Sequence, residues 1–222
     1  MSRVPQKLSA AILLAPALLA ASVTAQAYET GDVILRAGAV AVDPQENSGK
    51  VKLDGTATDL EVGVDSNVQL GLTGTFMLSD KLGLGLLAAT PFKHTINLNG
   101  VGELAEIKHL PPTLTLQYFP LGSGSALQPY VGAGLNYTTF FSEDFKSGPS
   151  AGGFNDLSLD DSWGLALEAG VDYMLTDNIV VNAAVWYADI DTEANFKVGD
   201  IPGKVSVDID PYVYMVGLGY KF

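Results

Sequence analysis

Two histidines are the side chains in this sequence best suited to acid–base or metal chemistry. His94 and His109 are the only histidines, and the chain has no cysteine. Hydrolysis or group transfer needs such a base beside a nucleophile or an activated water. Serine, aspartate and glutamate are available, but they form no recognisable catalytic motif with either histidine. We therefore expect no enzyme and no cofactor. Solvated loop histidines are the favoured interpretation, and a metal-binding pair is a weaker alternative.

Carboxylates offer a second kind of chemistry, the binding of divalent cations. The chain has 25 acidic and 12 basic residues, an excess that argues against nucleic acid as a partner. Loop carboxylates could hold cations that bridge lipopolysaccharide phosphates, although such residues are more often simply solvated. The acidic residues in expected loops are Glu143, Asp144, Asp160, Asp161, Asp191, Glu193 and Asp200.

The N-terminus has the features of an export signal. Two basic residues precede an apolar stretch over residues 8–21, and residues 25–27 read Ala-Gln-Ala, a small-x-small cleavage pattern. The stretch is shorter than the ~20 residues that a membrane-spanning helix needs, so an N-terminal anchor is the less favoured alternative. We expect residues 1–27 to be a signal peptide cleaved near Ala27, and residues 28–222 to form the mature domain.

The elements that position these side chains are predicted from alternation with a period of two. In residues 162–175 one parity is wholly apolar or aromatic and the other is small or polar, so one face meets hydrocarbon and the other a lumen. Beyond the signal no apolar run is long enough for a spanning helix, and bilayer interiors admit only helices or closed barrels. Eight segments show this alternation, more regularly in some than in others: residues 32–42, 67–78, 81–92, 109–120, 127–141, 162–175, 178–190 and 205–222.

The connections between these segments alternate in length. The long ones are residues 43–66, 93–108, 142–161 and 191–204, and the short ones are 79–80, 121–126 and 176–177. We therefore predict an all-β fold: an eight-stranded antiparallel transmembrane up-and-down β-barrel of the Gram-negative outer membrane, with short periplasmic turns and long extracellular loops.

Outward-facing aromatic residues fall at two heights, as in the interfacial girdles of membrane barrels. A soluble lipocalin-like barrel would alternate too, but it has no reason to form two belts. The terminal Tyr220 and Phe222 are typical of an assembly signal read by the barrel-assembly machinery. The predicted upper girdle is Phe92, Tyr137, Trp163, Tyr187 and Tyr212, and the lower one is Phe76, Tyr118, Tyr173, Tyr220 and Phe222.

The inward parity predicts a lumen of two parts. An eight-stranded barrel is only about wide enough for its own side chains, and paired charges with amides near the periplasmic end would form a polar plug. Apolar residues near the outer end would form a hydrophobic funnel, with ordinary lumen packing as the alternative. The plug residues are Arg36, Gln69, Gln117, Glu168, Asp172, Asn182 and Lys221; the funnel residues are Val40, Val42, Leu87, Ala89, Phe140, Trp186 and Ile190.

Three prolines point to an interruption in the barrel wall. Pro111 and Pro112 begin the fourth segment, and Pro91 ends the third. Proline has no N–H to donate to a strand ladder, so hydrogen-bond donors are missing where the outer ends of the third and fourth segments meet. A lateral opening could form at this position, which is called the seam below. Prolines that merely end strands at a loop are the alternative.

The same segments resemble the OmpW family of outer-membrane proteins, which includes AlkL-like barrels. The residues that carry the resemblance span nearly all of the mature chain: LLAATPF at 86–92, HLPPTL at 109–114, PYVGAGLNYTTFF at 129–141, LSLDDSWG at 157–164, VWYADIDT at 185–192 and DPY at 210–212. The resemblance implies a barrel that passively carries small hydrophobic or amphipathic solutes inward and releases them sideways into the bilayer. It places a channel gate on Leu87 and Trp186, and it implies no covalent chemistry.

Three classes of function follow. Passive uptake of hydrophobic solutes is the leading hypothesis. The alternative is a structural or interaction barrel that binds lipopolysaccharide or divalent ions, or serves as a docking point for phage or bacteriocin. An outer-membrane enzyme acting on lipids or peptides is the third, and it would depend on His94 or His109.

Overall fold

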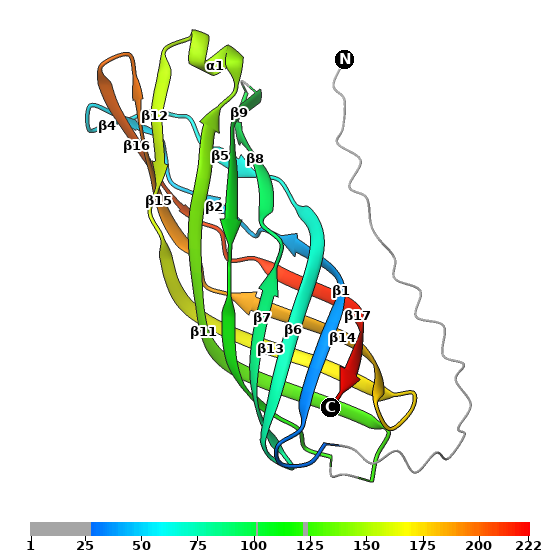
Figure 1. The fold of residues 1–222 in the computed structure, drawn as a ribbon. Helices are drawn as coiled ribbons and strands as arrows, with labels where there is room; N and C mark the ends of the chain where they lie inside the picture. The colour runs from blue at the N-terminus through cyan, green and yellow to red at the C-terminus, as the bar shows by residue number, and fades with distance from the viewer. Residues whose placement is uncertain (1–27, 101, 122–123) are drawn as a thin grey trace, which may run out of the picture.

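The computed structural model describes residues 28–100, 102–121 and 124–222, which form a tall β-structure (Figure 1). The predicted signal peptide lies outside the described residues. Among those residues no helix is long and apolar enough to cross a membrane, and the short α1 (Ser147–Ala151) lies near the tip of the molecule.

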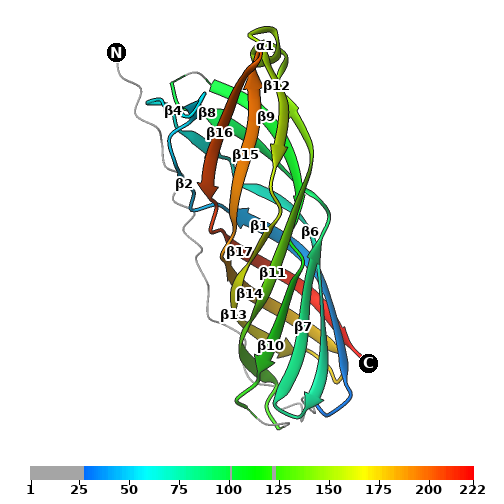
Figure 2. The same ribbon diagram turned by 90° about the vertical axis from the view of Figure 1, so that its left-hand side faces the viewer.

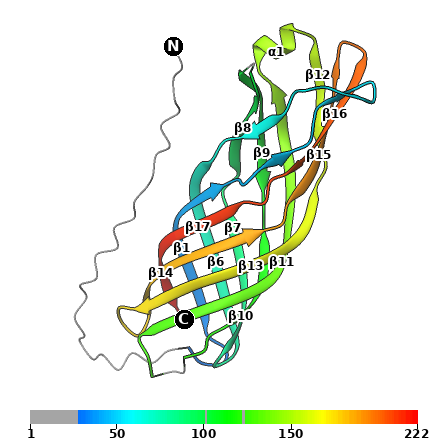
Figure 3. The same cartoon turned by 180° about the vertical axis from the view of Figure 1, so that it is seen from behind.

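Eight strands close into a barrel. Their order around the wall is β10-β7-β6-β1-β17-β14-β13-β11, and pairing between β10 and β11 completes the circle. Every pair is antiparallel, and Figure 3 shows β1, β17, β14 and β13 side by side in one wall. The bounds are β1 (Val33–Asp43), β6 (Asn67–Ser79), β7 (Leu82–Ala89), β10 (Thr113–Tyr118), β11 (Leu127–Phe145), β13 (Ser162–Met174), β14 (Ile179–Ala188) and β17 (Tyr212–Lys221).

Alternation along each strand sorts side chains between two environments. In β10, Leu114 and Leu116 are about half exposed on the outer surface, whereas Thr113, Thr115 and Gln117 are buried in the lumen. This is the apolar-out, polar-in order of a membrane barrel, and the predicted fold is confirmed.

Above the barrel the wall continues as two smaller sheets. One places β9 (Gly102–Leu110), β8 (Phe92–Leu98) and β5 (Val62–Val64) against the upper half of β11. The other contains β12, β15 and β16 with three short strands, and Figure 2 shows these elements rising beyond the barrel. Their bounds are β12 (Phe154–Leu159), β15 (Asp191–Val198), β16 (Ile201–Asp208), β2 (Asn47–Ser48), β3 (Lys52–Leu53) and β4 (Thr56–Ala57).

Three predicted segments are wrong in their extent. Residues 81–92 stop at Ala89, residues 109–120 begin only at Thr113, and residues 205–222 are two strands separated around Pro211. In each case a proline that cannot donate to the ladder stands at the break. Hydrophobic pattern alone runs across these positions, whereas backbone hydrogen bonding does not.

The aromatic girdles are present with one correction. Trp163 is 73% exposed on the outer surface and its ring centre lies 4.6 Å from that of Tyr137. Phe222 is 66% exposed at the opposite end, beside Tyr220. Phe92, however, is buried, because it begins β8 after the break at Pro91 and turns inward.

Candidate functional site

A buried ion pair forms the centre of the predicted polar plug. Arg36 on β1 and Asp172 on β13 are both inaccessible to solvent. The guanidinium contacts both carboxylate oxygens, with 3.0 Å from Nε to Oδ1 and a second bond from the other arm to Oδ2. The Tyr28 hydroxyl donates to Oδ2 at 2.5 Å, and Asn182 Nδ2 donates to Oδ1 at 2.8 Å. Two-armed contact and added donors are what a buried pair needs to offset desolvation.

A second set of polar groups extends the plug across the lumen. Arg36 donates to the Thr75 hydroxyl at 2.8 Å, which donates to Gln117 Oε1 at 3.0 Å. Gln117 Nε2 donates to Glu168 at 2.9 Å, and Thr115 donates to the same carboxylate at 2.6 Å. The network joins β1, β6, β10 and β13, so side chains cross the lumen where a straight pore would have to pass.

Two predicted plug residues lie outside this network. Lys221 lies toward the periplasmic end, as predicted, near the end of β17, where its ammonium group is 3.9 Å from the Asp32 carboxylate just before β1. Gln69 pairs in register with Val40 near the extracellular end, where it accepts a hydrogen bond from Thr90 at 3.2 Å. Parity places both on the inner face, but it does not fix the height of Gln69 or the partner of Lys221, because these depend on strand register.

Above the plug the two upper sheets enclose an apolar cavity of about 70 Å³. Most of its wall comes from segments that the sequence alone assigns to long connections, and the rest comes from the start of the predicted segment 205–222, so this cavity is absent from the predicted funnel. The twenty lining residues are apolar apart from Thr192: Val51, Leu53, Leu60, Val62, Val64, Ile96, Leu98, Leu104, Ala105, Ile107, Phe145, Phe154, Leu157, Leu159, Thr192, Ala194, Phe196, Val205, Val207 and Ile209.

A second, much smaller pocket adjoins the extracellular cavity. Its volume is about 10 Å³, and it shares Val64, Ile107 and Ile209 with the cavity above. Space of that size holds about one water molecule. Both His94 and His109 line it, so a polar spot lies directly below the apolar cavity.

A third pocket, also of about 10 Å³, brings the predicted gate and seam together. Leu87 and Trp186 line it with Pro111, and it shares Val42 and Ile190 with the pocket above. The structure thus places the gate pair beside one proline of the seam. Because the space admits only about one water, a larger solute can pass only when these side chains move.

The remaining predicted funnel and seam residues lie around these pockets. Phe140 lines the second pocket, which shares lining residues with the other two and is called the middle pocket below. Val40 is fully buried, and Ala89 packs against the same apolar cluster. Pro91 and Pro112 flank the break without lining the three pockets.

The strand ladder is interrupted at the predicted seam. Pairing between β7 and β10 ends at Leu87 and Thr113. Pairing between the following strands, β8 and β9, begins at Phe92 and His109. Four residues on one side and three on the other therefore lie between the last pair of one ladder and the first pair of the next.

All three seam prolines fall within this interval. Pro91 is on one side, and Pro111 and Pro112 are on the other. The Pro112 carbonyl accepts from the Tyr137 N–H at 3.0 Å, so β11 still holds the segment from one side. Strand pairing around Pro111 and Pro112 is therefore missing only on the side that faces Pro91.

The histidines are not solvated, which overturns that interpretation. His94 is 2% exposed and His109 is 7% exposed. Their ring centres are 4.8 Å apart, and His109 stacks on Phe92 at 5.5 Å. Burial lowers the pKa of His109 to about 3, with a contribution from nearby His94, and burial also lowers the pKa of His94. Both rings are therefore neutral near pH 7. No nucleophile of the described chain is bonded to either ring nitrogen.

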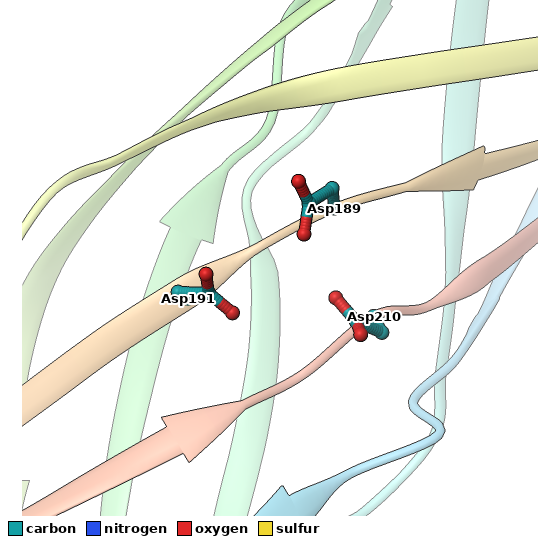
Figure 4. A group of neighbouring side chains, drawn as sticks. All are labelled: Asp189, Asp191 and Asp210. Atoms are coloured by element: carbon teal, nitrogen blue, oxygen red, sulfur yellow. The ribbon is translucent and has the colours of Figure 1, made fainter.

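Three aspartates cluster where β14 leads into β15 (Figure 4). Asp189, Asp191 and Asp210 each bring a carboxylate oxygen within 4.8 Å of the others. Partial burial and these like charges raise the pKa of Asp191. Asp210 accepts a hydrogen bond from the Ile190 N–H at 3.2 Å, which fixes the strand junction. Exposed carboxylates often gather without an ion, so the cluster alone does not define a cation site.

Comparisons with known proteins give a consistent picture. The family model described as the OmpW family matches residues 29–222. Outer membrane protein W of Vibrio cholerae is 48% identical over 201 residues, covering 88% of this chain and 91% of that protein. The crystal structure of OprG from Pseudomonas aeruginosa is 52% identical with a TM-score of 0.87, covering 89% and 98% of the two chains. Outer membrane protein AlkL of Ectopseudomonas oleovorans is 24% identical over 202 residues, covering 88% and 84%. These names denote outer-membrane proteins and not enzymes.

Proposed function

The chain belongs to the OmpW family and is a β-barrel of the Gram-negative outer membrane, and from this premise we propose that it is a channel for passive uptake of small hydrophobic or amphipathic solutes. The observation that supports the proposal is the order of the lumen. Three adjoining pockets descend from an apolar cavity to a break in the wall, and a polar network lies beneath them.

Uptake would begin at the extracellular cavity. A hydrophobic solute gains about 25 cal/mol for each Å² of apolar surface that leaves water, and the cavity offers an almost wholly apolar lining. No energy source is needed, because the gradient from the outer medium to the bilayer drives movement. Amphipathic solutes fit the same path when their polar group is small.

The gate would then control passage. Leu87 and Trp186 are both buried and leave too little space for a solute. Side-chain rotation on a short timescale would admit it, since rotamer changes need no rearrangement of the ladder. Leu87 and Trp186 are therefore the residues to which we assign gating.

Exit would be lateral. The plug around Arg36 and Asp172 obstructs a straight course, because a hydrophobic solute would have to displace buried, bonded charges. The interrupted ladder at Pro111 and Pro112 offers a shorter way into the surrounding hydrocarbon, with Pro91 on the facing side. Outer-membrane lipid is then the first acceptor of the solute.

Biogenesis would use the C-terminal aromatic pair. Tyr220 and Phe222 end the last strand and remain exposed on the outer surface. We assign them to recognition by the barrel-assembly machinery, and residues 1–27 to a signal peptide removed near Ala27.

Uptake by proteoliposomes tests the proposed function. We expect vesicles with lipopolysaccharide in their outer leaflet to take up labelled n-octane several-fold faster with the purified barrel than without it, because the cavity and seam bypass the lipopolysaccharide layer. Labelled arabinose, a polar solute of small size, should enter both kinds of vesicle at the same rate. Equal octane uptake with and without protein would contradict the proposal. It would favour the structural or lipopolysaccharide-binding alternative, especially if lipopolysaccharide binding then proved sensitive to a chelator.

A further inference from the structure

Two histidines that line the middle pocket each have a buried nitrogen atom that the protein leaves unpartnered. Nε2 of His94 and Nδ1 of His109 make no hydrogen bond in the structure. Both side chains are more than nine-tenths buried. An unsatisfied buried polar atom is destabilising, so such a pair, on two residues that line one pocket, needs an explanation.

The hydrogen bond made by the other nitrogen of His94 determines the tautomer of its ring. Nδ1 of His94 lies 2.5 Å from the backbone carbonyl oxygen of Asp65. A carbonyl only accepts, so Nδ1 carries the proton. In a neutral ring Nε2 is then an acceptor. His109 has no such constraint, and its Nδ1 can donate in one of the two neutral tautomers. Together the rings offer one acceptor and one donor.

The space beside the rings suits a single oxygen atom. The pocket is about 10 Å³ in volume, close to the minimum for one water. The ring centres are 4.8 Å apart, near enough for one oxygen to lie about 3 Å from a nitrogen of each ring. The pocket shares Ile107 and Ile209 with the extracellular cavity of about 70 Å³, so an apolar chain attached to that oxygen has somewhere to lie.

We propose that His94 and His109 form a binding subsite for the hydroxyl group of a neutral aliphatic alcohol, whose hydrocarbon chain occupies the extracellular cavity. The inference rests on the proposed channel function and narrows its substrate class. The alcohol O–H donates to Nε2 of His94, and its oxygen accepts from Nδ1–H of His109. One hydroxyl satisfies both unpartnered atoms.

Other head groups fit this subsite less well. An alkane leaves both nitrogens unsatisfied, and an ether or ketone has no proton for Nε2 of His94. A carboxylate would bring an unpaired charge into an apolar pocket, which is costly, and neutral imidazoles provide no counter-charge. A zinc ion usually takes four protein or water ligands, whereas apart from the two histidines and Thr138 the pocket is lined by aliphatic, aromatic and proline side chains that cannot bind a metal.

A pair of isomeric probes tests the inference. 1-Octanol and 1-methoxyheptane have the same formula, but only the alcohol has an O–H. We expect the wild-type barrel in lipid nanodiscs to bind 1-octanol about tenfold more tightly than the ether. Titration with octanol should also shift the ¹⁵N resonance of Nε2 of His94, and the ether should shift it far less.

Variants separate the subsite from the rest of the cavity. His94→Phe should bind both probes with equal affinity, whereas the control Phe140→Leu, which alters the same pocket without removing a nitrogen, should keep the preference. Equal wild-type affinities, or a preference that survives in His94→Phe, would overturn the inference and leave a bridging water as the occupant of the pocket. The wild-type comparison decides the matter even if a variant fails to fold. If the preference for octanol is absent but octane uptake is intact, the hydroxyl subsite is wrong and the proposed channel function still holds.

Discussion

Replacing Arg36 with methionine is expected to lower the free energy of unfolding of the barrel by about 3–5 kcal/mol, the usual cost of leaving one member of a buried ion pair alone. Asp172 would lose its cation in a site inaccessible to solvent, with only the Tyr28 hydroxyl and Asn182 amide as donors. Urea titration of the barrel in detergent micelles, followed by tryptophan fluorescence, measures the change.

Two controls separate the ion pair from the loss of any charge. Lys50→Met removes a cation from the exposed pair with Asp59 and should cost less than about 1 kcal/mol. The double variant Arg36→Met/Asp172→Leu should recover much of the lost stability, because no buried charge then remains. A change below 1 kcal/mol in Arg36→Met, or a double variant less stable than the single one, would refute the assigned role of the pair.

Filling the extracellular cavity is expected to stop uptake. Ala105 is buried and lines the cavity, so Ala105→Trp would place an indole in a space of about 70 Å³. We expect the part of octane uptake that depends on the barrel to fall at least about tenfold, toward the rate of empty vesicles, which corresponds to a barrier raised by about 1.4 kcal/mol or more. Arabinose leakage should not change.

A tryptophan on the lipid-facing surface provides the matched control. Leu165 is 66% exposed on β13, and Leu165→Trp adds an indole outside the path. This control should take up octane as the wild type does. If Ala105→Trp folds, as shown by the gel shift of a heat-stable barrel, and still transports octane at the wild-type rate, then solutes do not cross the cavity.

The barrel and its plug could be predicted because both depend on local alternation. Leu114 and Thr115 point to opposite sides of one strand whatever the rest of the chain does. Parity brings Arg36, Asp172 and Glu168 inside, but the choice of Asp172 as the partner of Arg36 depends on strand register. Their partner Tyr28 could not be predicted in this way, because it precedes the first strand.

The upper cavity and the histidine pair could not be predicted from length and alternation of the barrel segments alone. The upper sheets are built by pairing between distant segments, for example Val62 with Leu98, and short strands leave little pattern. A signal for the histidines was present: Ile107 and His109 share a parity in β9, and both are buried. The break at Pro111 hid it, because the parity of a strand cannot be carried across an interrupted ladder.

Photolabelling can follow a solute through the cavity and out at the seam. A diazirine-bearing hydrocarbon of octane length would be irradiated with the barrel in bilayers, and the labelled residues mapped by mass spectrometry. We expect labels on cavity residues such as Ala105, at the gate of Leu87 and Trp186, and at Pro111, with none on Arg36 or Glu168. Labels within the plug would instead show a straight path, and labels confined to the outer surface would show that the solute never enters the lumen.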